Sequence, residues 1–360
     1  MTSRPSPFAS SAALEPAFAE GLAAMLEQHA GLGVYILVLA NAAYDPALWA
    51  RLSPALSARH AELAATLTAT LRSGRKLSEP DDDVLVFLKL HAIGFEHLQQ
   101  LESRRAGPWE ILFNPLRALR PPRTSGLKFE TLRCPFDATS FHFNKPFLAK
   151  EIFGEGELAG KAARLLYNKF PFARLHGLLV PDPLQQTPQY LSLELHEWAW
   201  RICTESAVAG LCLGYNSYGA GASVNHLHFQ SFVRDQPLPV QDARFAHNGG
   251  DQHYPLPCLR FTDAESAWFH LDQLHQTHTP YNLIYSQGCL HCIARVPQDS
   301  AQLSDPIRGY GWSEMAGVVT LFSREAFDRL STADFEAALA DFAPRGGKAP
   351  SIHTGSIDVF

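Results

Sequence analysis

Apolar residues in the first hundred positions recur at helical spacing. Residues 12–30 and 45–75 are rich in Ala and Leu at intervals of three and four, and Asp82–Glu102 continues the pattern. Asp81 to Asp83 stand at the start of the third segment, where acidic groups satisfy N-terminal amides and complement the helix dipole. We therefore predict a layer of helices, whose simplest role is packing or dimerisation.

From Trp109 onward the pattern changes to short apolar runs separated by turns. Residues 109–113 predict a strand that leads into an Arg/Pro loop, and the phenylalanines at 141 and 143 alternate as in another strand. Two apolar runs flank a polar bend in residues 165–183, which is typical of a β-hairpin. Residues 192–207 have helical spacing.

The last third repeats these kinds of element. Residues 281–298 read as two alternating strands around a Gln-Gly turn, whereas residues 266–278 and 324–342 have helical spacing. Helices and hairpins without a regular βαβ alternation favour an α+β fold with antiparallel sheet. The two halves of this region can share an architecture, although no fixed-period repeat is visible.

Composition and charge narrow the class of protein. Of the 360 residues, 46% are apolar and 18% are charged, so the chain can bury a substantial core. The formal net charge of −6 argues against nucleic-acid binding through a global positive field, so any phosphate has to be held by a local site. The longest apolar stretch, Gly33–Ala43, is too short to cross a bilayer, and the Ser/Pro-rich start lacks the apolar core of a signal peptide.

The six cysteines are spaced irregularly and predict reduced thiols in a cytoplasmic protein. Cys289 and Cys292 are the one pair at metal spacing, and they need ligands from elsewhere to hold zinc. Two buried thiols on a strand are the simpler interpretation, so we expect no metal ligands and no required cofactor.

Candidate chemistry concentrates in Gly214–Val233. If residues 226–231 form a strand, His226, His228 and Gln230 share one face, while the alternate residues bury the other. Polar groups gathered on one face cost desolvation free energy unless something uses them. A pair of structural histidines and a two-histidine zinc site are the alternatives for this pattern.

A Gly-rich turn precedes these histidines directly. Glycines let backbone N–H groups converge on an anion, and hydroxyl and amide side chains add hydrogen bonds to the same oxygens. An imidazole beside such a turn can attack an α-phosphorus and carry the nucleotide as a phosphoramidate. The turn's candidate phosphate-binding residues are Asn216, Ser217, Gly219, Gly221 and Ser223.

The string from Gly214 to Gln230 resembles the HxHxQ motif of the transferase branch of the histidine-triad (HIT) superfamily. That branch contains galactose-1-phosphate uridylyltransferase, diadenosine tetraphosphate phosphorylase and the GDP-L-galactose and GDP-D-glucose phosphorylases, and this string is most similar to the GDP-hexose enzymes. The resemblance covers roughly residues 109–325 and leaves the helical N-terminus unexplained. It implies an antiparallel half-barrel with flanking helices and two related halves.

The resemblance also implies roles for single residues. His228 is the expected covalent nucleophile, Gln230 the expected hydrogen-bond partner of the nucleotidyl phosphate, and His226 a positioning group. Gly221 and Ser223 fall at positions that bind the α-phosphate. We therefore expect three units: a helical extension (1–105), a HIT-like half that carries the motif (106–240) and a second HIT-like half (241–360).

Several other polar residues are weaker candidates. Asn168 and Lys169 precede the hairpin where the superfamily contacts ribose or phosphate, although an exposed turn explains them equally. Three arginines, a lysine and two histidines have simpler interpretations as solvated or structural residues; they are Arg117, Arg120, Arg123, Lys145, His142 and His176.

The resulting hypothesis is a nucleotidyltransferase of the phosphorylase type. It would cleave a nucleoside diphosphate sugar, with a GDP-hexose favoured, and pass the nucleotide from His228 to inorganic phosphate or a sugar phosphate. A diadenosine polyphosphate phosphorylase or a UDP-hexose uridylyltransferase would use the same chemistry. A non-catalytic nucleotide- or zinc-binding protein is the alternative from another class, and neither nucleic acid nor membrane is an expected partner.

Overall fold

The structure is a computed structural model and describes residues 10–99, 101–119, 129–299 and 309–344. The helices of this part of the chain are α1 (Ser11–Gln28), α2 (Leu32–Tyr44), α3 (Pro46–Arg72), α4 (Asp81–Ile93), α5 (Leu193–Glu205), α6 (Ala264–Gln276), α7 (Trp312–Met315), α8 (Arg324–Arg329) and α9 (Thr332–Ala340). The strands are β1 (Glu102–Ala106), β2 (Trp109–Phe113), β3 (Ile152–Leu158), β4 (Lys161–Tyr167), β5 (Arg174–Pro181), β6 (Leu211–Asn216), β7 (Phe229–Val233), β8 (Cys258–Phe261), β9 (Tyr281–Ser286), β10 (Cys289–Ala294) and β11 (Val318–Leu321).

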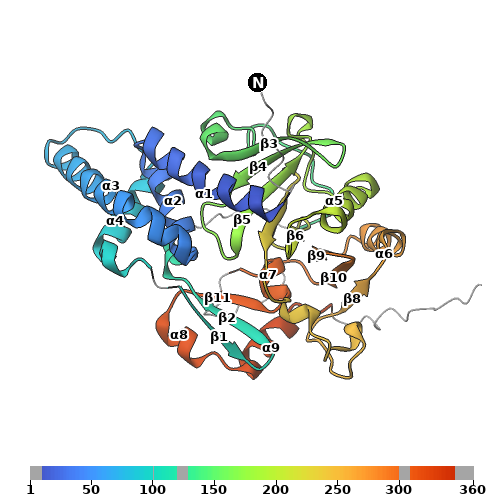
Figure 1. The fold of residues 1–360 in the computed structure, drawn as a ribbon. Coiled ribbons are helices and arrows are strands. Elements are labelled where there is room, and N and C mark those ends of the chain that lie inside the picture. Colours follow the sequence, from blue (N-terminus) through green and yellow to red (C-terminus); the bar gives the residue numbers. More distant parts are fainter. Residues whose placement is uncertain (1–9, 100, 120–128, 300–308, 345–360) are drawn as a thin grey trace, which may run out of the picture.

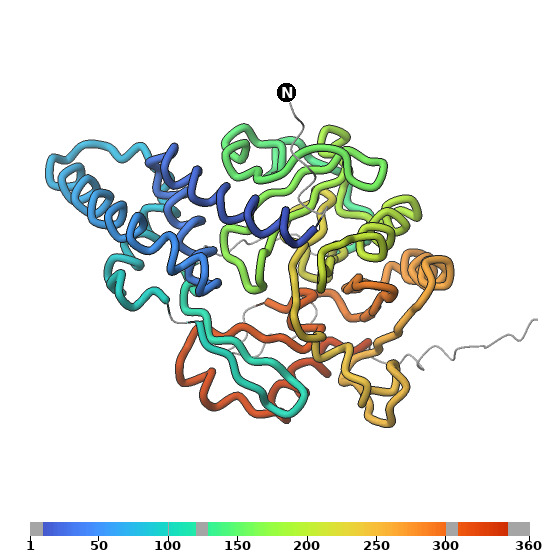
Figure 2. The backbone as a smooth tube through the Cα atoms, viewed as in Figure 1, coloured from blue at the N-terminus to red at the C-terminus, as the bar shows by residue number. Residues whose placement is uncertain are grey.

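The four N-terminal helices pack together at one side of the molecule (Figures 1 and 2). α2 is the centre of this bundle, because it is apolar on all sides and buried from Leu32 to Ala43. The Asp45 side chain caps α3 by accepting from two backbone amides of its first turn. The Tyr167 hydroxyl donates to the Phe18 carbonyl, 2.7 Å away, and so ties the bundle to the sheet.

The predicted helical layer is confirmed, with one wrong boundary. The helix predicted to reach Glu102 ends at Ile93, because Gly94 adopts a φ of 89° that does not continue a helix. Residues from Glu102 onward form β1 instead. Residues 1–9 and 345–360, which the predicted first and third units include, lie outside the described residues.

The main sheet has eight antiparallel strands in the order β3-β4-β5-β7-β6-β9-β10-β8. A smaller sheet has the order β1-β2-β11, in which β2 and β11 run parallel (Figure 1). The hairpins predicted at 165–183 and 281–298 are confirmed as β4–β5 and β9–β10. The α+β class with antiparallel sheet is therefore confirmed.

The main sheet is continuous across residue 240, where we predicted a boundary between two units. β6 pairs with β9 across that position, and β2 likewise pairs with β11 from the far end of the chain. The division into three units stays a prediction.

The two faces of the main sheet have separate cores. Leu213, Phe229 and Tyr285 lie on the face that the N-terminal helices, α5 and α6 cover. Phe232 lies on the opposite face, which packs against the small sheet and α7 to α9. On this second face the Trp312 ring rests on Gly214, where an added Cβ would come within 2.6 Å of the ring.

The strand predicted around Phe141 and Phe143 is wrong. Residues 137–145 form turns and irregular backbone, followed by a 3₁₀ turn at Pro146–Glu151. Phe143 is buried there against the side chains of the HxHxQ motif rather than in a sheet.

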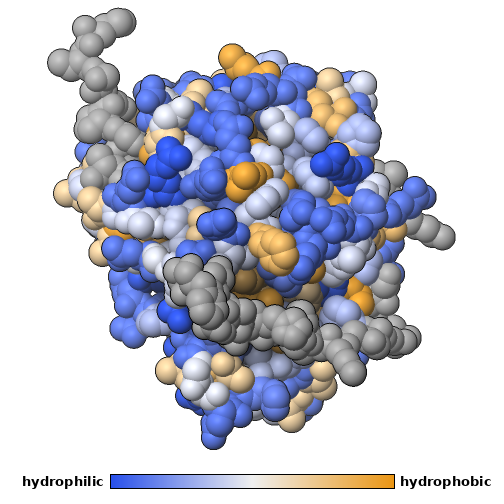
Figure 3. Space-filling view, turned by 90° about the vertical axis from the view of Figure 1, so that its right-hand side faces the viewer, coloured by the Kyte–Doolittle hydropathy of each residue, from blue (hydrophilic) through white to orange (hydrophobic). Residues whose placement is uncertain are grey.

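The surface of the described part is mixed. Hydrophilic residues dominate the face shown in Figure 3, and apolar residues occur there as small separate patches. Within the described ranges, every helix is too short or too polar to cross a lipid bilayer.

Candidate active site

His228 lies just before β7, where the ladder between β6 and β7 ends at the Gly214–Gln230 pair. Beyond that pair the carboxamide of Gln189 bridges the two strands. Its Oε1 accepts from the His228 amide at 2.9 Å, and its Nε2 donates to the carbonyls of His228 (3.2 Å) and Asn216 (2.9 Å). Because Gln189 is buried, these bonds fix the backbone of His228.

The His228 ring has a defined tautomer. Its Nδ1 lies 2.8 Å from the carbonyl oxygen of His226, which can only accept, so we assign the proton to Nδ1. Nε2 then carries the lone pair. A ring oriented by its own backbone in this way can act as a nucleophile through Nε2.

His226 takes the opposite tautomer. The amide of Phe143 donates to its Nδ1 at 3.1 Å, which leaves the proton on Nε2. Burial, aided by the neighbouring His228 and His142, lowers the pKa of His226 to about 4. Its Nε2 is shielded from solvent and makes no hydrogen bond within the described residues. His226 is therefore a neutral group that positions the carbonyl under His228.

Gln230 is oriented by His176 of β5. The amide of Phe172 donates to His176 Nδ1 at 3.3 Å, so we place the proton on Nε2, which donates to Gln230 Oε1 at 3.0 Å. Gln230 consequently directs its NH₂ group away from His176. Burial lowers the pKa of His176 to about 3, so it remains a neutral donor at physiological pH.

The Gly-rich turn divides into a structural and an open part. Asn216 Oδ1 accepts from Asn282 Nδ2 at 2.7 Å and from the Trp312 amide at 2.8 Å. The Ser217 hydroxyl accepts from the Tyr281 amide at 2.9 Å. Asn216 and Ser217, which were predicted to bind phosphate, therefore use these oxygens to hold the turn against β9 and α7.

The open part contains Gly219, Gly221 and Ser223. The amides of these three residues make no hydrogen bond to the described residues, and Gly221 and Ser223 are exposed. Gly221 has a φ of 91°, and its Cα is packed so closely that an added Cβ would lie 2.9 Å from the Tyr310 carbonyl oxygen. Amides in such a turn are available to an anion, and the phosphate-binding role of these residues stays a prediction.

The structure places Asn168 and Lys169 behind the site. Asn168 Oδ1 accepts from the Phe170 amide at 3.0 Å. Asn168 Nδ2 lies 3.2 Å from His176 Nε2. In the tautomer assigned to His176 both of these nitrogens carry protons, so this contact is not a hydrogen bond. Lys169 Nζ is ion-paired with Asp83 of α4 at 2.5 Å. Their contact with a ligand stays a prediction.

Arg117 departs from the interpretation as a solvated residue. Its guanidinium stacks over the Phe172 ring at 4.2 Å, and its Nε and Nη1 are shielded from solvent without hydrogen-bond partners among the described residues. Burial lowers its pKa, against the opposing charge of Glu314. It also contributes to lowering the pKa of His176, so this cation lies near the His176–Gln230 pair.

The remaining weak candidates divide between local contacts and segments that are not described. Lys145 Nζ donates to the carbonyl of Ala138 at 3.1 Å. Arg120 and Arg123 lie outside the described residues.

Possible metal ligands are dispersed. The described residues contain no group of three or more His, Cys, Asp or Glu side chains placed to hold a metal ion. Cys289 and Cys292, three apart on β10, point to opposite faces of the sheet, and all six thiols are free.

Sequence reasoning missed Gln189 and misjudged Arg117, whereas the interpretation of His176 as a structural residue agrees with its full burial. Gln189 has no sequence signal, because its partners come from two strands far along the chain. His176 lies in the same hairpin as Asn168. A prediction that β5 pairs with β7 would have placed His176 close to Gln230.

The fold and site define an α+β protein that holds an oriented histidine and a carboxamide beside a Gly-rich turn whose amides have no hydrogen-bond partners among the described residues at Gly219, Gly221 and Ser223. Residues 111–232 match the family model described as "GDPGP1-like, N-terminal domain". The chain is 34% identical over 131 residues to human GDP-D-glucose phosphorylase 1, which is 34% of this chain and 33% of that protein. It is 38% identical over 76 residues to GDP-L-galactose phosphorylase 1 of Arabidopsis thaliana, which is 21% of this chain and 17% of that protein.

The alignment with the human relative thus spans about a third of its length. Among solved structures, yeast Ap4A phosphorylase Apa2 matches with a TM-score of 0.48 and 16% identity, over 77% of this chain and 100% of that one. The resemblance to the GDP-hexose phosphorylases that the HxHxQ motif predicts is confirmed by the family model and the curated relatives.

Proposed function

We propose that this protein is a phosphorylase that transfers a nucleotidyl group from a GDP-hexose to inorganic phosphate through His228. The observation that carries the proposal is the bond from His228 Nδ1 to the His226 carbonyl, which leaves the lone pair on Nε2. The names of the curated relatives, GDP-D-glucose and GDP-L-galactose phosphorylase, support the choice of donor.

The first displacement follows from this geometry. Nε2 of His228 attacks the α-phosphorus, an N–P bond forms, and the bond from the α-phosphorus to the bridging oxygen breaks. Hexose 1-phosphate leaves with that electron pair. Because the second pKa of a phosphate monoester is about 6, this leaving group needs no proton at neutral pH. The neutral His176 and His226 are compatible with a step that uses no general acid.

The adduct is stabilised by groups already in place. Phosphorylation of Nε2 puts a positive charge on the ring, which strengthens the bond from Nδ1–H to the His226 carbonyl. The NH₂ of Gln230 and the amides of the Gly-rich turn are fixed donors for the transferring oxygens. In the second displacement inorganic phosphate attacks, the N–P bond breaks, and GDP leaves.

Intact-protein mass spectrometry tests the proposal. The protein is incubated separately with GDP-glucose, GDP-mannose, UDP-glucose, ADP-glucose and diadenosine tetraphosphate, beside His228→Ala and the exposed-histidine control His253→Ala. We expect a mass gain of one GMP in the wild type and the control, which is lost in acid and retained in alkali as for a phosphoramidate. His228→Ala should show none.

Other outcomes separate the alternatives. A gain of UMP or AMP would assign the same chemistry to a uridylyltransferase or a diadenosine polyphosphate phosphorylase. Nucleotide binding by calorimetry with no adduct from any donor would overturn the proposal in favour of a binding protein.

A further inference from the structure

The main sheet has an internal two-fold arrangement around β6 and β9. Each of these central strands follows a helix of 13 residues, α5 or α6, and precedes its hairpin partner, β7 or β10. β5 then flanks β7 as β8 flanks β10, so the order β5-β7-β6 is repeated in reverse as β9-β10-β8.

The strand registers give the equivalent residues. β6 and β9 each have six residues, and matching them end to end makes Gly214 equivalent to Ile284. These two residues also face each other across the β6–β9 ladder, which puts the two-fold axis at this pair. Gly214 pairs with Gln230, and Ile284 pairs with His291. His291 thus occupies in the second half the position of Gln230 in the first.

Ser286 pairs with Cys289 two positions beyond the Ile284–His291 pair. Asn216 and His228 lie two positions beyond the Gly214–Gln230 pair, where the β6–β7 ladder has ended. Cys289 is therefore the counterpart of His228. The connection differs, because the two-residue turn Gln287–Gly288 replaces the Gly-rich turn. The second half lacks both the nucleophilic imidazole and the open turn.

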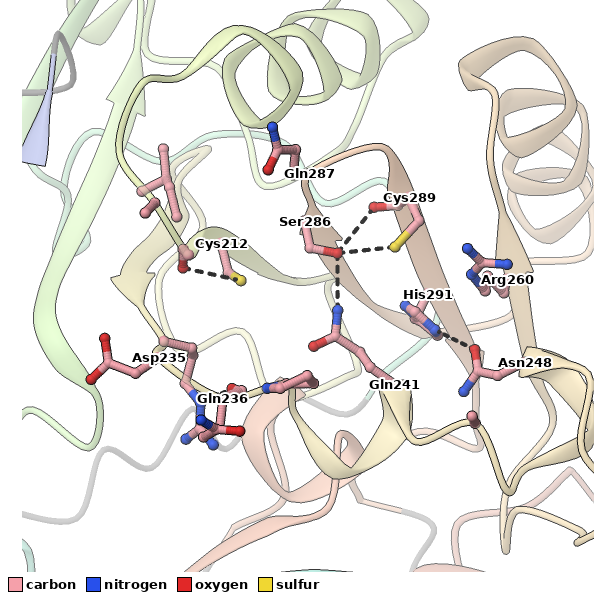
Figure 4. A pocket seen from close by; sticks show the side chains of 16 residues that line it. Cys212, Asp235, Gln236, Gln241, Asn248, Arg260, Ser286, Gln287, Cys289 and His291 are labelled. Atoms are coloured by element: carbon pink, nitrogen blue, oxygen red, sulfur yellow. Dashed lines mark hydrogen bonds between the residues drawn. The ribbon is translucent and has the colours of Figure 1, made fainter.

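A cleft of about 710 Å³ opens at this equivalent position (Figure 4). This volume suits a small-molecule ligand. The polar residues that line it include Gln241, Asn248, Arg260, Ser286, Cys289 and His291. It lies on the same face of the sheet as Gln230, because Gln230, Gly214, Ile284 and His291 are directly opposite one another across successive ladders.

The His291 ring lines this cleft and has a defined tautomer. Asn248 Nδ2 donates to the carbonyls of Val240 (2.8 Å) and Asp242 (2.9 Å), so its Oδ1 faces His291 Nε2 at 2.9 Å. The proton of His291 is therefore on Nε2. Its Nδ1 keeps the lone pair and is shielded without a hydrogen-bond partner among the described residues.

The charges at the cleft are separated. Arg234 is paired with Glu110 at 2.6 Å, whereas the exposed Arg260 makes no ion pair with the described residues. In Figure 4 Arg260 lies beside His291, and Asp235 lies at the opposite end. A cation in a cleft that is also lined by the exposed carboxamides of Gln236 and Gln287 fits a ligand that combines an oxyanion with hydroxyl groups.

We propose that this cleft binds a small polyhydroxylated molecule bearing a phosphate or carboxylate, with the oxyanion on Arg260, and that it catalyses no transfer. The inference rests on the sheet registers and the cleft, so it is independent of the proposed function.

Isothermal titration calorimetry with three probes tests the site: glucose 1-phosphate, gluconate and neutral glucose. The wild type is compared with Arg260→Gln and with Arg201→Gln, an exposed arginine of α5 away from the cleft. For whichever of the two anions binds the wild type more tightly, we expect Arg260→Gln to weaken the affinity about tenfold or more. This is the effect of losing one charge-assisted hydrogen bond. Arg201→Gln should bind like the wild type, and glucose should bind at least tenfold more weakly than that anion.

Alkylation of cysteines locates the ligand. Cys289 is half-buried and lines the cleft, whereas the half-buried Cys134 lies near the Gly-rich turn. The bound anion should slow the alkylation of Cys289 in the wild type but not in Arg260→Gln, whereas a change at Cys134 would report binding at the proposed active site. Equal affinity of every probe for wild type and Arg260→Gln, or no binding below about 10 mM, would overturn the proposal. Stronger binding of gluconate than of glucose 1-phosphate would assign the site to carboxylates.

Discussion

His176 is expected to act as a positioning residue for Gln230. His176 is fully buried, and its Nε2 donates to Oε1 of the half-buried Gln230 at 3.0 Å. In His176→Leu the donor is lost, and the carboxamide of Gln230 is no longer held with its NH₂ group toward the phosphate. One neutral hydrogen bond contributes about 1 kcal/mol, and an unpaired buried acceptor costs about 1–3 kcal/mol. We therefore expect kcat/KM to fall about 10- to 100-fold.

A double-mutant cycle separates positioning from general destabilisation. The rate of GDP-hexose phosphorolysis is measured for wild type, His176→Leu, Gln230→Ala and the double variant. If His176 acts through Gln230, the double variant should be no slower than Gln230→Ala, with a coupling free energy of about 1 kcal/mol or more. His176→Gln, whose carboxamide can still donate, should retain activity within about threefold of the wild type.

Additive effects of His176→Leu and Gln230→Ala, within about 0.3 kcal/mol, would refute the reasoning. So would wild-type turnover in His176→Leu. Thermal unfolding of each variant shows whether a slow variant is also unfolded at the assay temperature.

Two further predictions concern stability. The folded pKa of His176 is about 3, below the ordinary value of about 6.5, so its neutral form stabilises the fold fully above pH 6.5 and this contribution is lost as the pH falls. The contribution of His176 to the free energy of unfolding, measured with urea, should be about 2 kcal/mol smaller at pH 5 than at pH 7. If His176→Gln showed the same pH dependence of stability as the wild type, this prediction would be contradicted. Gln189→Leu removes three hydrogen bonds at the His228 and Asn216 backbone and should cost about 3 kcal/mol of unfolding free energy. Gln189→Leu should also slow adduct formation, and a variant with wild-type stability would contradict the bridging role.

Local sequence patterns correctly predicted the elements that are formed by residues close together in the chain. The hairpins β4–β5 and β9–β10 combine alternation with turn residues, so the sequence defines both the strands and their connection. The alternation from His226 to Gln230 also predicted correctly that Leu227 and Phe229 are buried behind the motif.

Contacts between distant segments could not be predicted in the same way. Phe143 alternates with Phe141 as in a strand, yet it packs its ring 4.9 Å from that of His228 and donates its amide to His226. The polar residues around Arg117 suggested a solvated loop, but Phe172, more than fifty positions away, shields its guanidinium. In both cases the side chain's role depends on a partner that no local pattern reveals.

The comparison of the two halves indicates which features of the sheet the proposed phosphate chemistry depends on. β9 and β10 are joined by two residues, so their ladder closes as far as the Ser286–Cys289 pair and uses the backbone groups there. The longer connection between β6 and β7 ends the ladder at Gly214–Gln230, and a side chain, Gln189, satisfies the backbone beyond it. The amides of the intervening turn then remain available to an anion. The two halves therefore differ in the length of this connection as well as in having histidine at position 228 and cysteine at position 289. For this reason we expect that Cys289→His alone would not create a transferase site in the second half.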